Sequence, residues 1–210
     1  MKRQLFIASS LSAALAGCSA IGTKLNDNPA FHAALGSASK LNQAVIGTRG
    51  MARLYPKSAI DPQFRVNGFD TPSSSMYQHL LKDDFHSYRL SVDGAVENRR
   101  AFTLAELQKM SQRSQITRHD CVEGWSVVGE WSGVALGDLL DVVKPRSDAR
   151  YVVFHCMDRS SDGDPYYESL NLGQARHPQT LLALQLNYKP LDADHGAPVR
   201  LRIPTQLGYK

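Results

Sequence analysis

The stretch ITRHDCVEGWS, residues 116–126, gathers ionisable side chains around one of the three cysteines of the chain. Cys121 follows His119 by two positions and Arg118 by three. A cysteine thiolate is a nucleophile when a base activates it, a ligand for soft metals, and half of a disulfide in an oxidising compartment. A cysteine is also common in protein cores. Four roles therefore stand open for Cys121: core residue, disulfide half, nucleophile and metal ligand.

Spacing weighs against two of these roles. The histidines and cysteines that could share a metal show no CxxC or HExxH pattern; they are His119, Cys121, His155, Cys156 and His195. Adjacent strand residues such as His155 and Cys156 point to opposite faces, which disfavours a zinc site. His119 and Cys121 would share one face of a strand, but no hydrolase motif surrounds them. A disulfide with Cys156 remains open.

The N-terminus has the pattern of an export signal. Basic Lys2 and Arg3 precede an apolar run that ends in small residues, and the run is too short to span a bilayer comfortably. The sequence Leu-Ala-Gly-Cys at 15–18 resembles a bacterial lipobox, which predicts a signal peptide over 1–17 and a lipid anchor at Cys18. Lys2-Arg3 is also a faint twin-arginine pattern. We expect an exported, membrane-anchored lipoprotein on the periplasmic side.

Composition excludes other classes of protein. The 210 residues are 42% hydrophobic and 21% charged, as in an ordinary globular protein. The net charge is +4, and no run of five or more Lys or Arg residues occurs. A nucleic-acid-binding surface is therefore not expected.

Hydrophobic patterns predict a mixed α+β domain over 61–210, after a tether and lead-in over 18–60. We expect a loop over 56–75, and then these elements: a strand in 88–96, a helix in 103–110 with a Thr103–Glu106 capping box, a strand in 114–124, a turn and a helix in 131–143, a buried strand in 149–157, a short helix at 173–175, an apolar segment and turn in 180–191, and a strand in 197–210. The helix in 131–143 should bury one face, formed by Leu136, Leu139, Leu140 and Val143. The chain ends directly after the last strand, so we expect the fold to be truncated at its C-terminus.

Four blocks in order carry a resemblance to a known family. They are TRHDCVEGWSVVGEWSGVALGDLL, ARYVVFHCMD, YYESLNLGQARHPQTLLALQLNYKPL and HGAPVRLRIPTQLGYK. Together, from about Phe64 to Lys210, they resemble the molybdopterin-binding domain of the sulfite oxidase superfamily. Within it they look most like the bacterial exported branch of protein-methionine-sulfoxide reductases. The resemblance implies a sulfite-oxidase-type fold and a molybdenum–molybdopterin cofactor.

The same resemblance implies roles for individual residues. Cys121 would be the single protein thiolate on molybdenum, because the pterin dithiolene supplies the other sulfurs. Arg118 beside it would favour the ionised thiol. The residues implied to contact the cofactor are Asn67, Cys156, His195 and Arg200. An arginine, with five donors, suits a phosphate or a pterin edge.

Two tyrosines, and one difference from the sulfite oxidase sequence pattern, bear on catalysis. Tyr166 and Tyr167 precede Glu168, and relatives often place a tyrosine at the open face of the metal; we take Tyr167 as the catalytic candidate. Sulfite oxidases carry a sulfite-binding arginine shortly after the metal cysteine, whereas this chain has Ser126 there. A sulfite site is therefore disfavoured.

The resulting expectation is a molybdopterin-dependent oxidoreductase that transfers oxygen atoms or electrons at a Mo-oxo centre. Its substrate would be a small molecule or an oxidised-sulfur compound, and its electron partner a membrane haem subunit. The alternative is an exported lipoprotein without catalysis, a binding or structural module with a Cys121–Cys156 disulfide.

Overall fold

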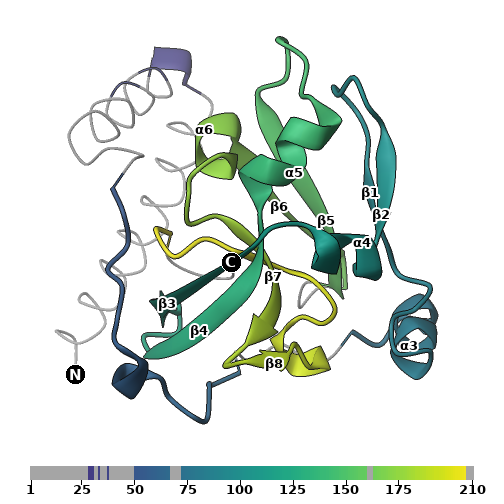
Figure 1. Ribbon diagram of the computed structural model, residues 1–210. Helices are drawn as coiled ribbons and strands as arrows, with labels where there is room; N and C mark the ends of the chain where they lie inside the picture. The colour runs from purple at the N-terminus through teal and green to yellow at the C-terminus, as the bar shows by residue number, and fades with distance from the viewer. Residues whose placement is uncertain are drawn as a thin grey trace, which may run out of the picture. The chain divides into compact units, whose positions relative to one another are not determined.

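The computed structural model describes residues 28–30, 33, 37, 50–66, 72–159 and 163–206 (Figure 1). The predictions for residues 1–18 and for Asn67 lie outside the described residues. The chain divides into two compact units, Met1–Thr48 and Arg49–Lys210. The second unit contains the candidate site.

Short helices and strands are interspersed along this unit, which confirms the predicted mixed α+β class. Their order is η1 (Lys57–Ala59), α3 (Ser75–Lys82), β1 (Arg89–Val92), β2 (Arg100–Thr103), α4 (Leu104–Lys109), β3 (Gln112–Asp120), β4 (Ser126–Ala135), α5 (Leu136–Val143), β5 (Tyr151–Arg159), β6 (Pro165–Asn171), α6 (Leu172–Ala175), β7 (Leu181–Leu186), β8 (Lys189–Pro190), η2 (Ala193–His195) and β9 (Arg200–Arg202). Within the described residues, no helix has the length and apolar character needed to cross a bilayer.

An antiparallel sheet forms the centre of the fold. Its order is β3-β4-β7-β8, and β9 pairs with β7. β3 and β4 form a long hairpin whose register runs from Gln112↔Val134 to Asp120↔Ser126. Cys121 lies in the turn of this hairpin, so the hairpin register sets its place in the fold.

The contact between β4 and β7 is unusually close at Gly133. The register shifts between Ser132 and Gly133. A Cβ atom on Gly133 would lie 2.0 Å from the carbonyl oxygen of Leu182 and 2.7 Å from the Cα of Ala183. Glycine at such a bulge permits a close backbone approach and a local bend of the sheet.

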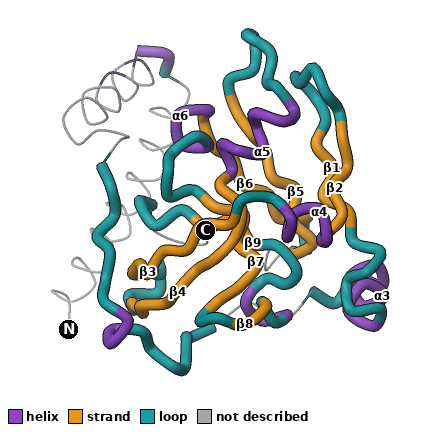
Figure 2. The backbone as a smooth tube through the Cα atoms, viewed as in Figure 1, coloured by secondary structure: helices purple, strands orange, loops and turns teal. Residues whose placement is uncertain are grey.

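The segment 50–66 runs mainly as loop beside the hairpin (Figure 2). A bridge joins Leu54 to Thr117, and the Tyr55 amide donates to the Ile116 carbonyl at 3.0 Å. Most of the predicted 56–75 loop is therefore non-helical, apart from one 3-10 turn and the start of α3. α3 was not predicted; Ser74 caps it by accepting from the Tyr77 amide, and only Tyr77 and Leu80 are buried.

β5 and β6 form a separate two-stranded ribbon. A strand was predicted at β5, but its continuous burial is wrong: exposed and half-buried residues alternate along it. Tyr151 and Val153 are exposed, at 68% and 51%. The ribbon therefore covers the core with one face only, as antiparallel strands commonly do.

Two predicted helices form as expected from their local signals. Thr103 and Glu106 make the reciprocal capping box at the start of α4. In α5, the predicted face is buried, with each side chain at most 3% exposed: Leu136, Leu139, Leu140 and Val143. The predicted turn at 131–135 is wrong, because these residues complete β4.

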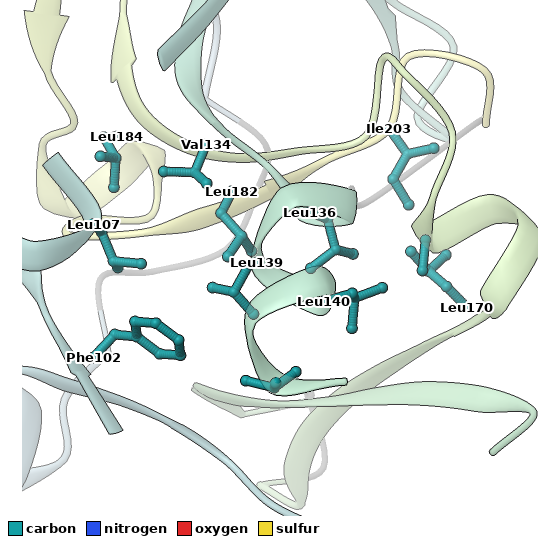
Figure 3. Packing of buried hydrophobic residues seen from close by; sticks show 12 residues of the cluster. Phe102, Leu107, Val134, Leu136, Leu139, Leu140, Leu170, Leu182, Leu184 and Ile203 are labelled. Atoms are coloured by element: carbon teal, nitrogen blue, oxygen red, sulfur yellow. The ribbon is translucent and has the colours of Figure 1, made fainter. Parts of the chain in front are cut away.

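The α5 face is the centre of the larger hydrophobic cluster (Figure 3). Around it lie Phe102 and Leu107 from the β2–α4 region, Leu170 from β6 and Ile203 after β9. Each such buried side chain contributes about 2 kcal/mol relative to exposure. A second cluster includes Trp131 and Phe64 and lies beneath the candidate site. The two clusters hold the hairpin, the ribbon and β9 as one unit.

Candidate functional site

Cys121 is held in a tight turn at the end of β3. Its amide donates to the Trp125 carbonyl at 2.9 Å, and the Gly124 amide donates to the Cys121 carbonyl at 3.1 Å. Gly124 has φ +86°, a conformation that favours glycine. The Cys121 side chain is 5% exposed and makes no disulfide. The turn thus holds one free thiol at a defined position.

A cavity of about 390 Å³ opens beside this thiol. It is lined by Asp120, Cys121, Gly124, Trp125, Ser126, Pro204, Thr205 and Gln206. The Ser126 hydroxyl donates to Asp120 at 2.6 Å, and the Trp125 indole donates to Glu123 at 2.7 Å. Among the described lining residues Asp120 is the charged one, and no arginine or lysine faces the cavity.

Cys156 lies in a different cavity, of about 220 Å³, between the β5–β6 ribbon and the segment 193–201. Burial, with the charges of Asp158 and Glu168, raises the pKa of its thiol to about 11. Burial also raises the pKa of Tyr88, which lines the same cavity, to about 12. Near neutral pH this cavity therefore presents protonated thiol and phenol groups.

Arg200 lines one cavity and interacts electrostatically with the cysteine of the other. It lines the Cys156 cavity, while the charge of Cys121 is among those acting on its guanidinium. Burial lowers the pKa of Arg200 to about 10, and the charges of Asp158 and Cys121 oppose this shift. No described carboxylate lies within 4 Å of Arg200, whose guanidinium stacks on Trp131 at 5.1 Å. It is a partly buried cation suited to an anionic ligand.

Arg118 forms an ion pair with a neighbouring carboxylate, and its expected effect on the Cys121 thiol stays a prediction. Its side chain is about half exposed and pairs with Asp120, with Nε and Oδ1 2.9 Å apart. The cation whose charge interacts with Cys121 is Arg200, which lies on β9, far away in the sequence.

His195 ties the segment 50–66 to the loop before β9. One ring nitrogen, Nδ1, lies 2.7 Å from Asp192, and Nε2 lies 3.1 Å from the Phe64 carbonyl oxygen. The Arg200 guanidinium donates to the His195 carbonyl at 3.3 Å. His195 lines neither cavity, and its carbonyl oxygen supports Arg200 by accepting from the guanidinium.

The two tyrosine candidates separate because strand residues alternate. Tyr167 is 64% exposed and lines neither cavity, so the structure does not bring it to the other candidates. Tyr166 lines the Cys156 cavity, and its hydroxyl donates to Glu168 at 2.7 Å. Tyr166 therefore lines a cavity, whereas Tyr167, the candidate predicted from the sequence, does not.

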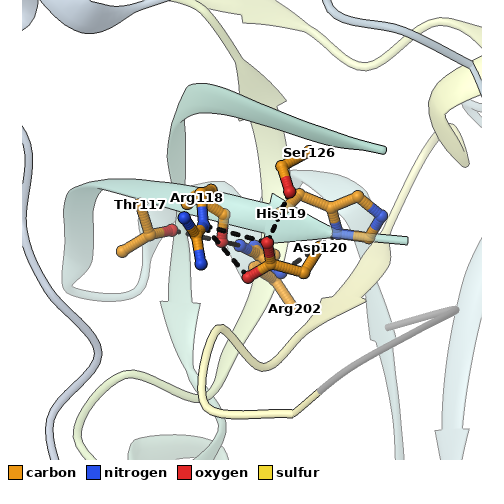
Figure 4. Close-up of polar contacts among 6 residues, drawn as sticks. All are labelled: Thr117, Arg118, His119, Asp120, Ser126 and Arg202. Atoms are coloured by element: carbon orange, nitrogen blue, oxygen red, sulfur yellow. Dashed lines mark hydrogen bonds and ion pairs between the residues drawn. The ribbon is translucent and has the colours of Figure 1, made fainter. Parts of the chain in front are cut away.

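Sequence reasoning missed Arg202, whose side chain contacts the residues of β3 that precede Cys121 (Figure 4). It is 1% exposed and donates to the Arg118 carbonyl at 2.8 Å and to the Thr117 hydroxyl at 3.2 Å. The signal was available, because residues two apart on a strand share a face, and Arg200 and Arg202 are two apart. Trp131 lies against both guanidiniums, 5.3 Å from that of Arg202.

The donor set fits a molybdenum–pterin cofactor better than a metal held by protein alone. Within the described residues, no group of three His, Cys, Asp or Glu side chains could hold a metal ion. A single buried thiol beside an open cavity suits a soft metal whose other sulfurs come from a cofactor. The Arg200 guanidinium, which has no carboxylate partner among the described residues, suits the cofactor's phosphate.

Comparison with known proteins identifies the family to which the chain belongs. The family profile described as oxidoreductase molybdopterin binding domain matches residues 77–210. A putative protein-methionine-sulfoxide reductase subunit YedZ1 from Azospira oryzae is 38% identical over 213 residues, which cover 99% of this chain and 76% of that protein.

Two catalytic subunits of protein-methionine-sulfoxide reductase, MsrP, are also similar. The protein from Xanthomonas campestris is 40% identical over 68% of this chain, and that from Campylobacter jejuni is 33% identical over 69%. The matches cover 47% and 53% of the two relatives, so the chain spans about half their length.

A solved structure shares the fold. The sulfane dehydrogenase SoxCD from Paracoccus pantotrophus aligns with a TM-score of 0.53 over 59% of this chain and 35% of that chain, at 23% identity. The family match and the relatives confirm the resemblance seen in the sequence. The chain belongs to the family of oxidoreductase molybdopterin-binding domains of the sulfite oxidase type.

Proposed function

We propose that this chain is the molybdenum-binding part of an exported oxidoreductase that reduces S-oxides, with Cys121 as its metal ligand. The observation that carries the proposal is the Cys121 turn: one free thiol, 5% exposed, beside a cavity of about 390 Å³. The partly buried Arg200 cation lies on β9, and the charge of Cys121 is among those that act on its guanidinium. A molybdenum–pterin cofactor would require a soft ligand for its metal and a cation for its phosphate, and Cys121 and Arg200 are groups of these two kinds.

When bound, the cofactor would supply a two-electron redox centre that accepts an oxygen atom. The Cys121 sulfur would fix the metal, and Arg200 would bind the anionic end of the pterin. His195 would support Arg200 through its carbonyl oxygen. Contacts from Asn67 and Cys156 to the cofactor remain predictions.

A neutral sulfoxide suits the Cys121 cavity better than sulfite does. The cavity is lined by the Asp120 carboxylate and by no described arginine or lysine, so an anionic substrate would gain no ion pair there. Ser126, which stands where sulfite oxidases carry an arginine, bonds to Asp120 instead. The names of the relatives refer to methionine sulfoxide, which supports this substrate class.

The overall reaction would be R₂S=O + 2H⁺ + 2e⁻ → R₂S + H₂O. The S=O bond breaks, the sulfur is reduced, and the oxygen leaves as water with two protons. We assign the holding of one proton to the Tyr166 phenol, whose hydroxyl donates to Glu168 in the Cys156 cavity, so the proton would have to reach the sulfoxide from outside the Cys121 cavity. Tyr167, as an exposed residue, is the weaker candidate.

The electrons would come from a partner at the membrane. We propose a haem-bearing membrane subunit, with this chain exported and lipid-anchored at Cys18 on the periplasmic side. The relatives carry the word subunit in their names, which supports a multi-subunit enzyme. A lipid anchor would keep the domain close to such a partner.

The alternative, a structural lipoprotein with a Cys121–Cys156 disulfide, has less support. Both cysteines are free, and they line different cavities. A thiol titration of the purified native protein would distinguish the two, because a disulfide would remove both thiols at once.

The decisive experiment is to express the full chain in a cofactor-competent host and to assay molybdenum, pterin and methionine sulfoxide reduction. We expect molybdenum and pterin in equal amounts and reduction that depends on an artificial electron donor. Protein without molybdenum would overturn the proposal, whereas loaded protein that does not reduce sulfoxides would overturn the substrate assignment alone.

A further inference from the structure

Arg202 joins two strands that are not neighbours in the sheet. β9 pairs with β7, β7 with β4 and β4 with β3, so two strands lie between β9 and β3. In a flat sheet three spacings of about 4.8 Å would separate them. Arg202 nevertheless donates to the Arg118 carbonyl on β3 at 2.8 Å. The sheet must therefore curl, and the close approach at Gly133 lies on that path.

Three contacts of Arg202 fall on consecutive residues that lead into the Cys121 turn (Figure 4). They are the Thr117 hydroxyl at 3.2 Å, the Arg118 carbonyl at 2.8 Å and His119 Nδ1 at 3.4 Å. Because a guanidinium only donates, Nδ1 of His119 accepts and the ring proton lies on Nε2. One buried cation thus fixes both the backbone of β3 and the His119 ring.

Trp131 contacts the guanidiniums of both Arg202 and Arg200. The indole is fully buried, with the guanidiniums of Arg200 and Arg202 at 5.1 and 5.3 Å from its ring. Burial, and then the charge of Arg200, lowers the pKa of Arg202 to about 9. The aromatic face attracts both cations, which otherwise repel each other.

We propose that Arg202 is a positioning residue: by joining β9 to the end of β3, it holds the Cys121 turn in register with Arg200. This inference rests on the proposed function, in which Cys121 and Arg200 bind two parts of one cofactor. The distance between those two groups is set by β3 and β9, and Arg202 is the side chain that bonds one strand to the other.

The test compares Arg202→Met and Arg202→Lys with Arg113→Met. Arg113 lies at the far end of β3 and pairs with Asp138 at the surface, so it serves as the matched control. Full-length protein prepared without cofactor is alkylated, and the rate at each cysteine is followed by peptide mass spectrometry. Cys156, in the other cavity, is the internal reference.

In Arg202→Met we expect the alkylation of Cys121 relative to Cys156 to rise about tenfold, since the turn opens more often without its charge-assisted bonds. Arg202→Lys should give an intermediate rise, because one ammonium can still reach the Arg118 carbonyl. Arg113→Met should leave the ratio unchanged. An unchanged ratio in a folded Arg202→Met protein would overturn the proposal.

If Arg202→Met does not fold, Arg202→Lys and Thr117→Val are measured in the same assay. If the alkylation of Cys121 relative to Cys156 is unchanged in both variants, the proposal is overturned. In metal-loaded protein, the thiolate-to-molybdenum absorption band should shift in Arg202→Met and return towards wild type in Arg202→Lys. Wild-type protein without molybdenum would defeat the proposed function, yet the alkylation ratio would still decide the role of Arg202.

Discussion

Gly133 on β4 meets the backbone of Leu182 on β7 so closely that a Cβ atom would lie 2.0 Å from the Leu182 carbonyl oxygen. Backbone atoms cannot yield as a flexible side-chain end can. Gly133→Ala should therefore lower the free energy of unfolding by about 3 kcal/mol or more. Urea unfolding of the two proteins measures this difference.

Gly137→Ala is the matched control for that substitution. Gly137 lies in α5, and a Cβ there would contact the Cα of Arg176 at an ordinary 3.7 Å. Alanine in a helix should be neutral or stabilising by up to about 1 kcal/mol. Equal losses at the two glycines would mean that the close β4–β7 approach does not set the shape of the sheet.

The two cysteines should respond differently to serine. In Cys121→Ser we expect loss of the thiolate-to-molybdenum absorption band and of reductase activity, because serine lacks the thiolate sulfur that would give the band and bind the metal. Cys156→Ser should retain most of both, since its thiol is protonated near neutral pH. Absorption spectra and molybdenum content measure the outcome, and equal losses in both variants would favour the disulfide alternative.

Phenylalanine substitutions distinguish the catalytic roles of Tyr166 and Tyr167. Tyr166→Phe removes the hydroxyl that donates to Glu168, and it should lower kcat by about 100-fold if this phenol relays a proton. Tyr167→Phe should leave kcat within about twofold, because its side chain is exposed and lies outside both cavities. The opposite ranking would return the catalytic role to Tyr167.

Glu106 should make the fold sensitive to acid. Bonds from the Thr103 amide, Arg100 and the Thr103 hydroxyl lower its pKa from 4.5 to about 2. The folded state then binds fewer protons than the unfolded state between these values. Its stabilising effect is therefore complete above about pH 4.5 and is lost as the pH falls towards 2.

Glu106→Gln provides the comparison, because the amide oxygen can still accept the capping-box bond but does not titrate. Unfolding midpoints measured from pH 6 to pH 2 should fall less steeply in this variant than in the wild type. Parallel curves would show that the capping box does not contribute to acid sensitivity.

The parts of the fold that follow from local signals could be predicted. The capping box of α4 needs only Thr103 and Glu106, and the buried face of α5 follows from its helical spacing. Of the β3–β4 hairpin only the first strand was predicted, because residues 131–135 also suit a turn and no strand was expected at β4. Their strand pairing with β7 is a long-range contact, which local patterns do not contain.

The resemblance predicts Cys121 as the metal ligand, and this stays a prediction, whereas the surroundings of Cys121 could not be predicted from the sequence. The motif around Cys121 and the order of the blocks indicated the metal ligand. They did not indicate that Cys121 and Cys156 line separate cavities, because the β5–β6 ribbon and the hairpin meet only in three dimensions. The Arg-Leu-Arg alternation at Arg200 and Arg202 was visible, but burial of a second cation depends on Trp131, about 70 residues earlier.

The bond from Arg202 to the Arg118 carbonyl spans 84 positions of the chain. A ribosome adding 5–20 residues per second would need roughly 4–17 s between making these two residues. Until then the Cys121 turn has its own backbone hydrogen bonds but lacks the contacts that Arg202 makes with β3. Under the proposed function, the fold would therefore place metal binding after the synthesis of β9.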